Sequence, residues 1–329
     1  MVYVRLKDIA EKAGVSINTV SRSLKDKPDI SEKTRQRIRQ IADELGYIPH
    51  ANASGLRSRK SNTIGIIVTH INNAFFSRIL QGISDAISSY GYTIITLTSN
   101  EDISREKDLF ITLASNRVEG IIFVPSRDIE NTINYDEINV PHLTIVRKGN
   151  LNTQDYFTID SYQSGRIAAD YFLQLGRKQP AYIGYALPVS CNKARLDGFR
   201  ERLYEHKIEL KKSSVELCNS TSDSAYQATR KLVEREGHVD SIFVYNDQMA
   251  FGVVRALYDG GIKIPEEISV VGHDDIEEAK HFIPALSTIR VSKYRLGYES
   301  AECLIEKIQN KNSSSKSVIY NPEMIVRET

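Results

Sequence analysis

The sequence has few cysteines and no long apolar run, and these absences narrow the classes of protein that it can encode. Its three cysteines, Cys191, Cys218 and Cys303, are widely spaced and match no disulfide framework or metal motif. We therefore expect buried thiols in a reducing compartment. No segment approaches the roughly 18 apolar residues that a membrane-spanning helix needs, and the start of the chain lacks the apolar core of a secretory signal. We expect a soluble, cytoplasmic protein without a membrane partner.

Motifs of catalysis and of cofactor binding are also missing. The chain contains no nucleophile motif, zinc-ligand spacing, phosphate-cradling glycine loop or dinucleotide fingerprint. The nearest approach to a catalytic pair is His273 beside Asp274. We therefore predict that the protein is not an enzyme, that it has no metal site and that it needs no cofactor.

Charge is unevenly distributed along the 329 residues. The formal net charge is +1, but residues 1–60 hold 13 Lys and Arg against 7 Asp and Glu. Because the totals are 43 and 42, the remaining residues hold 30 basic against 35 acidic side chains. A basic head on an acidic body is typical of a polyanion-binding module joined to a globular domain. An ordinary charged surface remains the alternative.

Residues 6–24 have the pattern of two short helices joined by a tight turn. The first helix has an apolar face at helical spacing, made of Leu6, Ile9, Ala10 and Ala13. Gly14 permits a sharp turn, and Ser16 is a good N-cap for the second helix. The side chains left outward near the start of that helix are Ile17, Asn18, Ser21 and Arg22. In a helix-turn-helix, these positions face base edges and phosphates of DNA.

A third helix and a linker follow this pair. Ser31 can cap the helix, and Gly46 stands where a helix C-terminus favours a left-handed residue. Its inward stripe consists of Ile38, Ile41, Ala42 and Leu45. Residues 50–61 are small and polar and have no core of their own, which predicts a linker. Within it, Ala51, Ala53 and Leu56 could line one side of a single short helix.

From Thr63 onward, short apolar runs alternate with amphipathic helical segments. The pattern predicts strands at 64–68, 93–97, 120–124, 181–184, 241–245 and 268–272, and helices near 75–90, 104–116 and 162–175. Continuous apolar strands separated by helices favour parallel sheets covered on both faces. The two successive series predict two α/β lobes. Ligands of such folds bind beyond the carboxyl ends of the strands.

Polar residues follow many of these predicted strands. They occupy 70–73, 99–100, 125–126, 160, 246–247 and 273–275. Together with Arg195 on a helix, they could hydrogen-bond a polyhydroxylated ligand from several directions, with Phe75 and Phe76 as an apolar platform. Polar residues in such places also commonly cap the next helix, and a Phe-Phe pair commonly belongs to a core. Convergence from both lobes favours the ligand site.

Over its full length, the chain resembles LacI/GalR-type transcriptional repressors. The matching motifs are Leu6-Lys7-Asp8-Ile9-Ala10, Ala13-Gly14-Val15-Ser16, Thr19-Val20-Ser21-Arg22, Thr63-Ile64-Gly65, Asn73-Ala74-Phe75-Phe76, Glu119-Gly120-Ile121-Ile122, Asn246-Asp247-Gln248-Met249-Ala250, Ile268-Ser269-Val270-Val271-Gly272-His273-Asp274-Asp275 and Val326-Arg327-Glu328. The resemblance implies an all-α helix-turn-helix headpiece and a two-lobed, periplasmic-binding-protein-like α/β core with parallel sheets. It also implies a homodimer. The chain lacks an apolar heptad after the core, so we expect dimers rather than tetramers.

The resemblance implies three domains with definite boundaries. They are a headpiece at 1–49, a hinge helix and linker at 50–61, and an effector-binding and dimerisation core at 62–329. Within the core, the N-lobe comprises about 62–161 and 292–321, and the C-lobe comprises about 162–291 and 322–329.

Family positions assign DNA contacts in the headpiece and hinge. Ile17, Asn18 and Arg22 match the main base-reading positions, and bidentate hydrogen bonding suits Arg to guanine and Asn to adenine. The phosphate-contacting positions are matched by Ser16, Thr19, Ser21, Ser31 and Thr34. Leu56 matches the hinge leucine that wedges into the minor groove, and Ala53 lies on the same hinge helix. The implied DNA partner is a double-stranded, near-palindromic operator.

Family positions also assign a small-molecule effector site in the core. Its residues are Asp160, Arg195, Asn246 and Asp274, with Phe75 as a platform and with Asn100 and Ser126 at positions that contact sugars in some members. This set favours a sugar, and because the chain has no Trp, Tyr or Phe must supply any stacking face. We predict a repressor of carbohydrate-utilisation genes controlled by a small sugar or sugar derivative. A nucleobase or nucleoside, or a partner protein, remains the alternative regulator.

Overall fold

The computed structural model describes residues 4–47, 61–149, 155–236, 238–310 and 314–329. The chain divides into two compact units, Met1–Ser61 and Asn62–Thr329, which we name the headpiece and the core. The predicted hinge helix, with Ala53 and Leu56, lies outside the described residues.

The headpiece folds around a small apolar core. Its helices are α1 (Leu6–Ala13), α2 (Ile17–Ser23) and α3 (Glu32–Leu45). Ile9, Val20 and Ile38, one from each helix, are buried together. The predicted helix-turn-helix and third helix are therefore confirmed.

The ends of the headpiece helices follow the local signals in the sequence. Ser16 and Ser31 cap α2 and α3, and each hydroxyl accepts the backbone N–H of the residue three positions further on, at 3.1 and 3.3 Å. Gly14 (φ +66°) and Gly46 (φ +67°) end α1 and α3 in the left-handed conformation. In the first turn of α2, Ile17 and Asn18 are exposed, whereas Val20 packs with α1.

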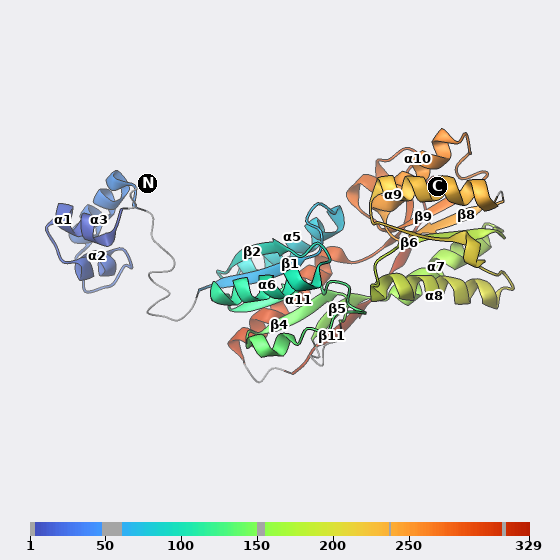
Figure 1. Cartoon of the computed structure of the whole chain (residues 1–329). Coiled ribbons are helices and arrows are strands. Elements are labelled where there is room, and N and C mark those ends of the chain that lie inside the picture. Colours follow the sequence, from blue (N-terminus) through green and yellow to red (C-terminus); the bar gives the residue numbers. More distant parts are fainter. Residues whose placement is uncertain (1–3, 48–60, 150–154, 237, 311–313) are drawn as a thin grey trace. The chain divides into compact units, whose positions relative to one another are not determined.

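The core contains two six-stranded sheets, each with its own helices (Figure 1). The N-lobe sheet has the order β11-β5-β4-β3-β1-β2 and consists of β1 (Thr63–Val68), β2 (Thr93–Thr98), β3 (Gly120–Phe123), β4 (His142–Val146), β5 (Tyr156–Ile159) and β11 (Ser317–Tyr320). The C-lobe sheet has the order β12-β10-β9-β8-β6-β7 and consists of β6 (Pro180–Tyr185), β7 (Val215–Cys218), β8 (Ser241–Val244), β9 (Ser269–Asp274), β10 (Ser287–Arg290) and β12 (Glu323–Ile325). Among the described strands, β10 and β12 pair antiparallel and the other pairs are parallel.

Helices cover both faces of each sheet. Those of the N-lobe are α5 (Ala74–Ser88), α6 (Ile103–Ser115) and α11 (Lys293–Gln309), and those of the C-lobe are α7 (Ser161–Gln174), α8 (Ser190–Glu205), α9 (Ser222–Glu236) and α10 (Asp247–Asp259). Short 3₁₀ turns lie at Tyr135–Ile138, Lys212–Ser214 and Glu277–Lys280. Successive strand residues serve opposite faces, since Ile66 packs with α5 and α11 whereas Ile67 packs with α6. This double burial explains why the predicted strands read as continuous apolar runs.

Several strands were not predicted from the sequence. β4, β5, β7, β10, β11 and β12 have three to five residues each, and some of them lie at or near a sheet edge. Such short segments give little periodic signal. The missing β4 matters most, because the residue that follows it, Arg147, turns out to line a pocket.

The chain passes between the two sheets three times, after β5, after β10 and after β11. β11 thus completes the N-lobe sheet and β12 the C-lobe sheet. Within the described ranges, no helix is both long and apolar enough to cross a bilayer.

Candidate functional site

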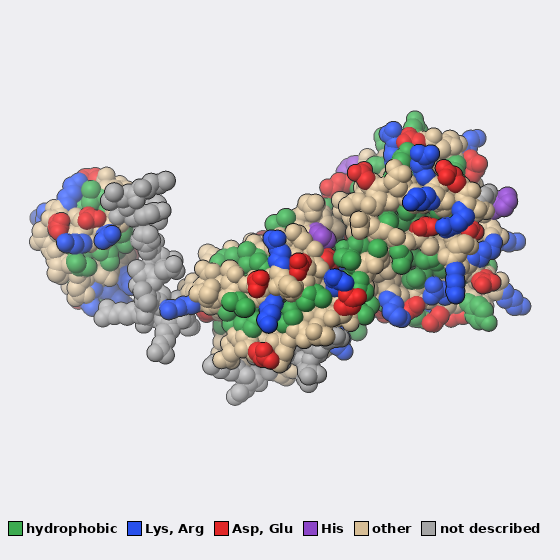
Figure 2. Space-filling view, in the orientation of Figure 1, with side chains coloured by type: hydrophobic (Ala, Val, Ile, Leu, Met, Phe, Trp, Pro, Cys, Tyr) green, Lys and Arg blue, Asp and Glu red, His purple; other side chains and the backbone are tan. Residues whose placement is uncertain are grey.

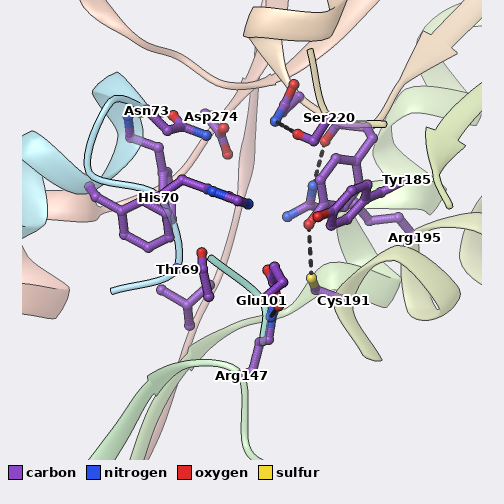
Figure 3. A pocket seen from close by; sticks show the side chains of 15 residues that line it. Thr69, His70, Asn73, Glu101, Arg147, Tyr185, Cys191, Arg195, Ser220 and Asp274 are labelled. Atoms are coloured by element: carbon purple, nitrogen blue, oxygen red, sulfur yellow. Dashed lines mark hydrogen bonds and ion pairs between the residues drawn. The ribbon is translucent and has the colours of Figure 1, made fainter. Parts of the chain in front are cut away.

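A pocket lies between the two lobes, at the carboxyl ends of strands from both sheets (Figure 3). It holds about 450 Å³ of space outside protein atoms, part of which is open to solvent. Its lining residues are Thr69, His70, Asn73, Phe75, Phe76, Glu101, Val146, Arg147, Tyr185, Cys191, Arg195, Ser220, Tyr245, Asn246 and Asp274. His70 and Asn73 enter it from the N-lobe, and Tyr185 and Arg195 face them from the C-lobe (Figure 3). The rule that ligands bind beyond strand ends thus locates the pocket correctly.

Aromatic rings line the pocket on both sides. Phe75 and Phe76, from the first turn of α5, meet edge to face with centroids 5.1 Å apart. On the C-lobe side, Tyr185 ends β6 and Tyr245 follows β8, and their ring centroids lie 5.5 Å apart. The Tyr245 hydroxyl lies 3.3 Å from the Cys191 thiol. These rings provide stacking faces that the sequence, lacking Trp, predicted would come from Tyr or Phe.

Arg195 places a buried guanidinium in the pocket wall. It projects from α8, is 4% exposed, and lies 4.8 Å from the ring centroid of Tyr245. Nη1 donates to the Tyr245 carbonyl oxygen. Nε is buried and has no hydrogen-bond partner among the described residues. The guanidinium therefore has N–H donors beyond its bond to Tyr245.

Asp274 provides an acceptor, and its neighbour holds it in place. The backbone at Asp274 has φ +117°, a conformation that few non-glycine residues adopt. Nδ1 of His273 lies 2.9 Å from the Asp274 carboxylate, and Nε2 lies 3.1 Å from the Ser164 hydroxyl. Burial lowers the pKa of His273 to about 4, so the imidazole is neutral at pH 7 and donates through Nδ1. Lys293 donates to the Asp274 carbonyl oxygen.

An ion pair lines the N-lobe side of the pocket. Arg147 donates Nη1 and Nη2 to the Glu101 carboxylate at 2.8 and 2.7 Å, and both side chains are almost fully buried. Burial raises the pKa of Glu101, but the charge and hydrogen bonds of Arg147 outweigh it and hold the pKa below its usual value. For His70, burial has the opposite effect from that on a carboxylate, and it lowers the pKa of the imidazole. The N-lobe side thus presents a neutral imidazole beside an internally balanced pair.

Four of the seven predicted effector residues line this pocket: Phe75, Arg195, Asn246 and Asp274. Asn246 is already engaged, because its Oδ1 caps α10 through Met249 N–H at 2.9 Å and its Nδ2 donates to Ser220 at 3.0 Å. Asn246 therefore lies in the pocket wall, but its amide oxygen and its amide nitrogen both bond to other groups of the protein.

The other three predicted effector residues do not line the pocket. Ser126 is fully buried and donates to the Ser99 hydroxyl at 2.7 Å. Asp160 caps α7 by accepting the Gln163 N–H at 2.8 Å. Asn100 is exposed at the end of β2, with φ +55°. Strand-end position alone did not distinguish these local roles from a pocket-lining one.

Several pocket residues were missed. Glu101, Arg147, Tyr185 and Tyr245 all follow or end strands, so the carboxyl-end rule applied equally to them. A prediction of β4 would have directed attention to Arg147. The pairing of Glu101 with Arg147 joins positions 46 residues apart and has no local signal.

The headpiece presents the predicted base-reading residues on α2. Ile17 is 49% exposed, which is unusual for a large apolar side chain, and Asn18 beside it is exposed as well. Arg22, one turn further on, pairs with Asp29 through Nε at 2.8 Å and Nη2 at 2.6 Å. On the face seen in Figure 2, basic and acidic side chains of the headpiece are interspersed.

Four of the five predicted phosphate-contacting residues lie near helix starts. Ser16 and Thr19 share a hydroxyl contact of 2.9 Å, and Ser31 and Thr34 share one of 2.8 Å. Ser21, on α2, is partly exposed. In both pairs the serine caps its helix, and the serine and threonine hydroxyls stay at the surface.

Two family descriptions account for the two units. Residues 5–50 match "Bacterial regulatory proteins, lacI family", and residues 61–327 match "Periplasmic binding proteins and sugar binding domain of LacI family". The chain belongs to the LacI family. It is accordingly a DNA-binding transcriptional repressor of that family, which consists of regulators rather than enzymes.

Individual LacI-family relatives span the whole chain. The HTH-type transcriptional repressor PurR of Vibrio atlanticus (strain LGP32) is 31% identical over 326 residues, which is 98% of each chain. Among solved structures, the lac repressor dimer bound to operator and the anti-inducer ONPF has a TM-score of 0.87 and 26% identity, over 100% of this chain and 99% of that one. The CelR–cellobiose complex has a TM-score of 0.76 and 27% identity, over 99% of each chain.

Proposed function

We propose that this protein represses carbohydrate-utilisation genes and that a small sugar or sugar derivative in the interlobe pocket sets its operator affinity. The observation that carries this proposal is that one pocket wall offers both a donor and an acceptor. Arg195 has N–H groups beyond its bond to Tyr245, and the Asp274 carboxylate is held in place by His273. Polyhydroxylated ligands offer both acceptors and donors, and their apolar ring faces suit Phe75 and Tyr245. The cellobiose complex of the similar regulator CelR supports the same ligand class.

The DNA-binding part of the proposal concerns a homodimer on a near-palindromic operator in the cytoplasm. Ile17, Asn18 and Arg22 read bases in the major groove, and the hydroxyl residues at the starts of α2 and α3 contact phosphates. The hinge at 50–61 joins this headpiece to the core. Two half-sites then mirror the two-fold symmetry of the dimer.

Regulation follows from a difference in effector affinity between two conformations. Because the pocket draws residues from both lobes, a bound molecule stabilises one relative placement of the lobes. An effector that prefers the DNA-free conformation induces transcription, and one that prefers the DNA-bound conformation acts as a co-repressor.

A nucleobase or nucleoside is the second candidate effector. Aromatic rings from both lobes, Phe75 and Phe76 from the N-lobe and Tyr185 and Tyr245 from the C-lobe, suit a flat heterocycle. The similar repressors named PurR make this class a necessary part of any ligand screen.

Calorimetry with a ligand panel tests these assignments. Sugars, phosphosugars, nucleobases and nucleosides are titrated into the full chain and into two variants of α8, Arg195→Met and Arg200→Met. A hydrogen bond to a charged group contributes about 1.5–3 kcal/mol, so Arg195→Met should weaken binding by roughly ten- to a hundredfold. Arg200→Met, which alters an exposed arginine of the same helix, should bind as the unmodified protein does.

The outcome separates the candidates. If only sugars give a heat of binding, control by a carbohydrate is supported. If only nucleobases or nucleosides give one, the second candidate effector replaces the sugar. If no panel member binds or alters affinity for selected DNA, the small-molecule proposal fails.

A further inference from the structure

Arg22 is held by a specific carboxylate in the headpiece. Its Nε donates to Oδ2 of Asp29 at 2.8 Å and its Nη2 to Oδ1 at 2.6 Å. Asp29 lies in the segment between α2 and α3, seven residues further along the chain. The hydrogen bond from Arg22 is the main cause that lowers the pKa of Asp29, which therefore stays ionised.

The geometry leaves the other edge of the guanidinium available. A planar guanidinium has five N–H donors, and the carboxylate takes the Nε–Nη2 edge. The terminal Nη1–Nη2 edge still presents two parallel donors, which is the arrangement that guanine O6 and N7 accept. Asp29 thus engages Arg22 without occupying the donors that a base would need.

We propose that Asp29 is a positioning residue that orients Arg22 for base reading and so determines operator specificity. This inference rests on the proposed base-reading role of Arg22. Stability alone does not explain the pair, because its side chains are 43% and 49% exposed and exposed ion pairs contribute little to folding. A carboxylate beside a DNA-reading side chain also opposes attraction to phosphates. The orientation that Asp29 gives to Arg22 compensates for this weaker attraction to phosphates.

A second acidic residue of the headpiece supplies a matched control. Asp26 pairs with Arg39 of α3, so Asp26→Asn removes the same charge without affecting Arg22. Asp26 has φ +53°, a conformation that Asn tolerates well. Any effect common to Asp26→Asn and Asp29→Asn is therefore an effect of charge alone.

The experiment selects binding sites from a pool of duplexes with a randomised central segment, using the full-length protein. Base preferences at each position are compared among the unmodified protein, Arg22→Ala, Asp29→Asn, Asp26→Asn and the double variant Arg22→Ala/Asp29→Asn. Affinity for a random-sequence duplex is measured in parallel. Thermal unfolding followed by circular dichroism verifies that each headpiece remains folded.

We expect Arg22→Ala to abolish the preference at one base pair of each half-site. Asp29→Asn should reduce the preference at that same base pair by about fivefold or more, the lower end of what a bidentate arginine contributes. Asp29→Asn and Asp26→Asn should both raise affinity for random DNA, but Asp26→Asn should keep the base preference. The double variant should lose no more than Arg22→Ala alone.

Two different failures are distinguishable. If Arg22→Ala loses the preference while Asp29→Asn keeps it, or weakens all positions equally, the positioning role is overturned and the base-reading role stands. If Arg22→Ala keeps every base preference, the proposed reading role of Arg22 fails, and the inference about Asp29 fails with it.

Discussion

Charged side chains of the pocket wall differ in whether an oppositely charged side chain neutralises them in an ion pair. Glu101 and Arg147 neutralise one another in a bidentate pair, which a buried charge requires, although Arg147 Nε, like Arg195 Nε, has no hydrogen-bond partner among the described residues. Arg195 and Asp274 instead have donor and acceptor atoms beyond the bonds found among the described residues. The first pair shapes the wall, and the second pair is the one that we expect to contact an effector.

Acid should destabilise the core through His273. Burial is the main cause that lowers its pKa from the usual 6.5 to about 4. The unfolded chain therefore binds a proton near pH 6.5 and the folded chain only near pH 4. This contribution to stability, roughly 3 kcal/mol, is complete above the unfolded pKa and is lost as the pH falls through the folded one.

Urea unfolding between pH 7 and pH 4 measures this effect. The unmodified protein should lose about 3 kcal/mol more over this range than His273→Gln does. His281→Gln, which alters an exposed histidine, should behave like the unmodified protein. Parallel curves for all three proteins would show that His273 does not titrate as expected.

At the scale of secondary structure, several helices begin directly after the carboxyl ends of strands, where the pocket also lies. Asn73, Asp160 and Asn246 each cap the helix that follows a strand, namely α5, α7 and α10. A parallel sheet brings its strand ends, and hence these caps, to one edge. The same polar residues therefore give the same sequence signal whether they cap a helix or face a ligand.

Gly165 controls how closely α7 approaches α8, the helix that carries Arg195. A Cβ at Gly165 would lie 2.1 Å from the Arg195 carbonyl oxygen, which a backbone atom cannot accommodate. Gly165→Ala should force the helices apart, lower the free energy of unfolding by about 1–3 kcal/mol and weaken effector binding. Gly260→Ala places its Cβ no closer than 3.4 Å to a neighbour and should leave effector binding unchanged.

Denaturant unfolding and calorimetry on the two glycine variants check this prediction. Equal effector affinity in Gly165→Ala and the unmodified protein would show that the helix spacing does not position Arg195.

At the scale of the whole molecule, the proposed DNA-reading residues and the proposed effector pocket belong to different compact units. Within the core, three passages of the chain join two lobes that both line the pocket. A molecule bound there contacts both lobes at once. Under the proposed function, regulation then depends on how a bound molecule places the two lobes.

Coupling between the two sites must be reciprocal. If the effector changes affinity for a selected operator duplex by a given factor, that duplex must change effector affinity by the same factor. We expect about five- to 150-fold, the usual range of such coupling. Calorimetric titration of effector with and without the duplex measures it, and identical effector affinities in both titrations would contradict coupling.

The sequence alone determined the features that depend on neighbours along the chain. Caps such as Ser16 and Ser31 and the turn at Gly14 predicted the headpiece, and apolar runs between helices predicted the two lobes. The carboxyl-end rule indicated Asn246 and Asp274, which lie in the pocket wall, whereas Arg195 was predicted separately, on a helix. These predictions succeeded because caps, turns and hydrophobic periodicity are local.

Only the tertiary structure decided which polar side chains face the pocket and which are used internally. Ser126 and Asp160 bond to nearby groups, while Arg147 crosses to Glu101 and Tyr245 turns toward Arg195. Arg22 likewise has a partner, Asp29, that its own helix does not contain. Such pairings depend on distances between segments that only folding brings together, and on which polar groups must be satisfied when they are buried.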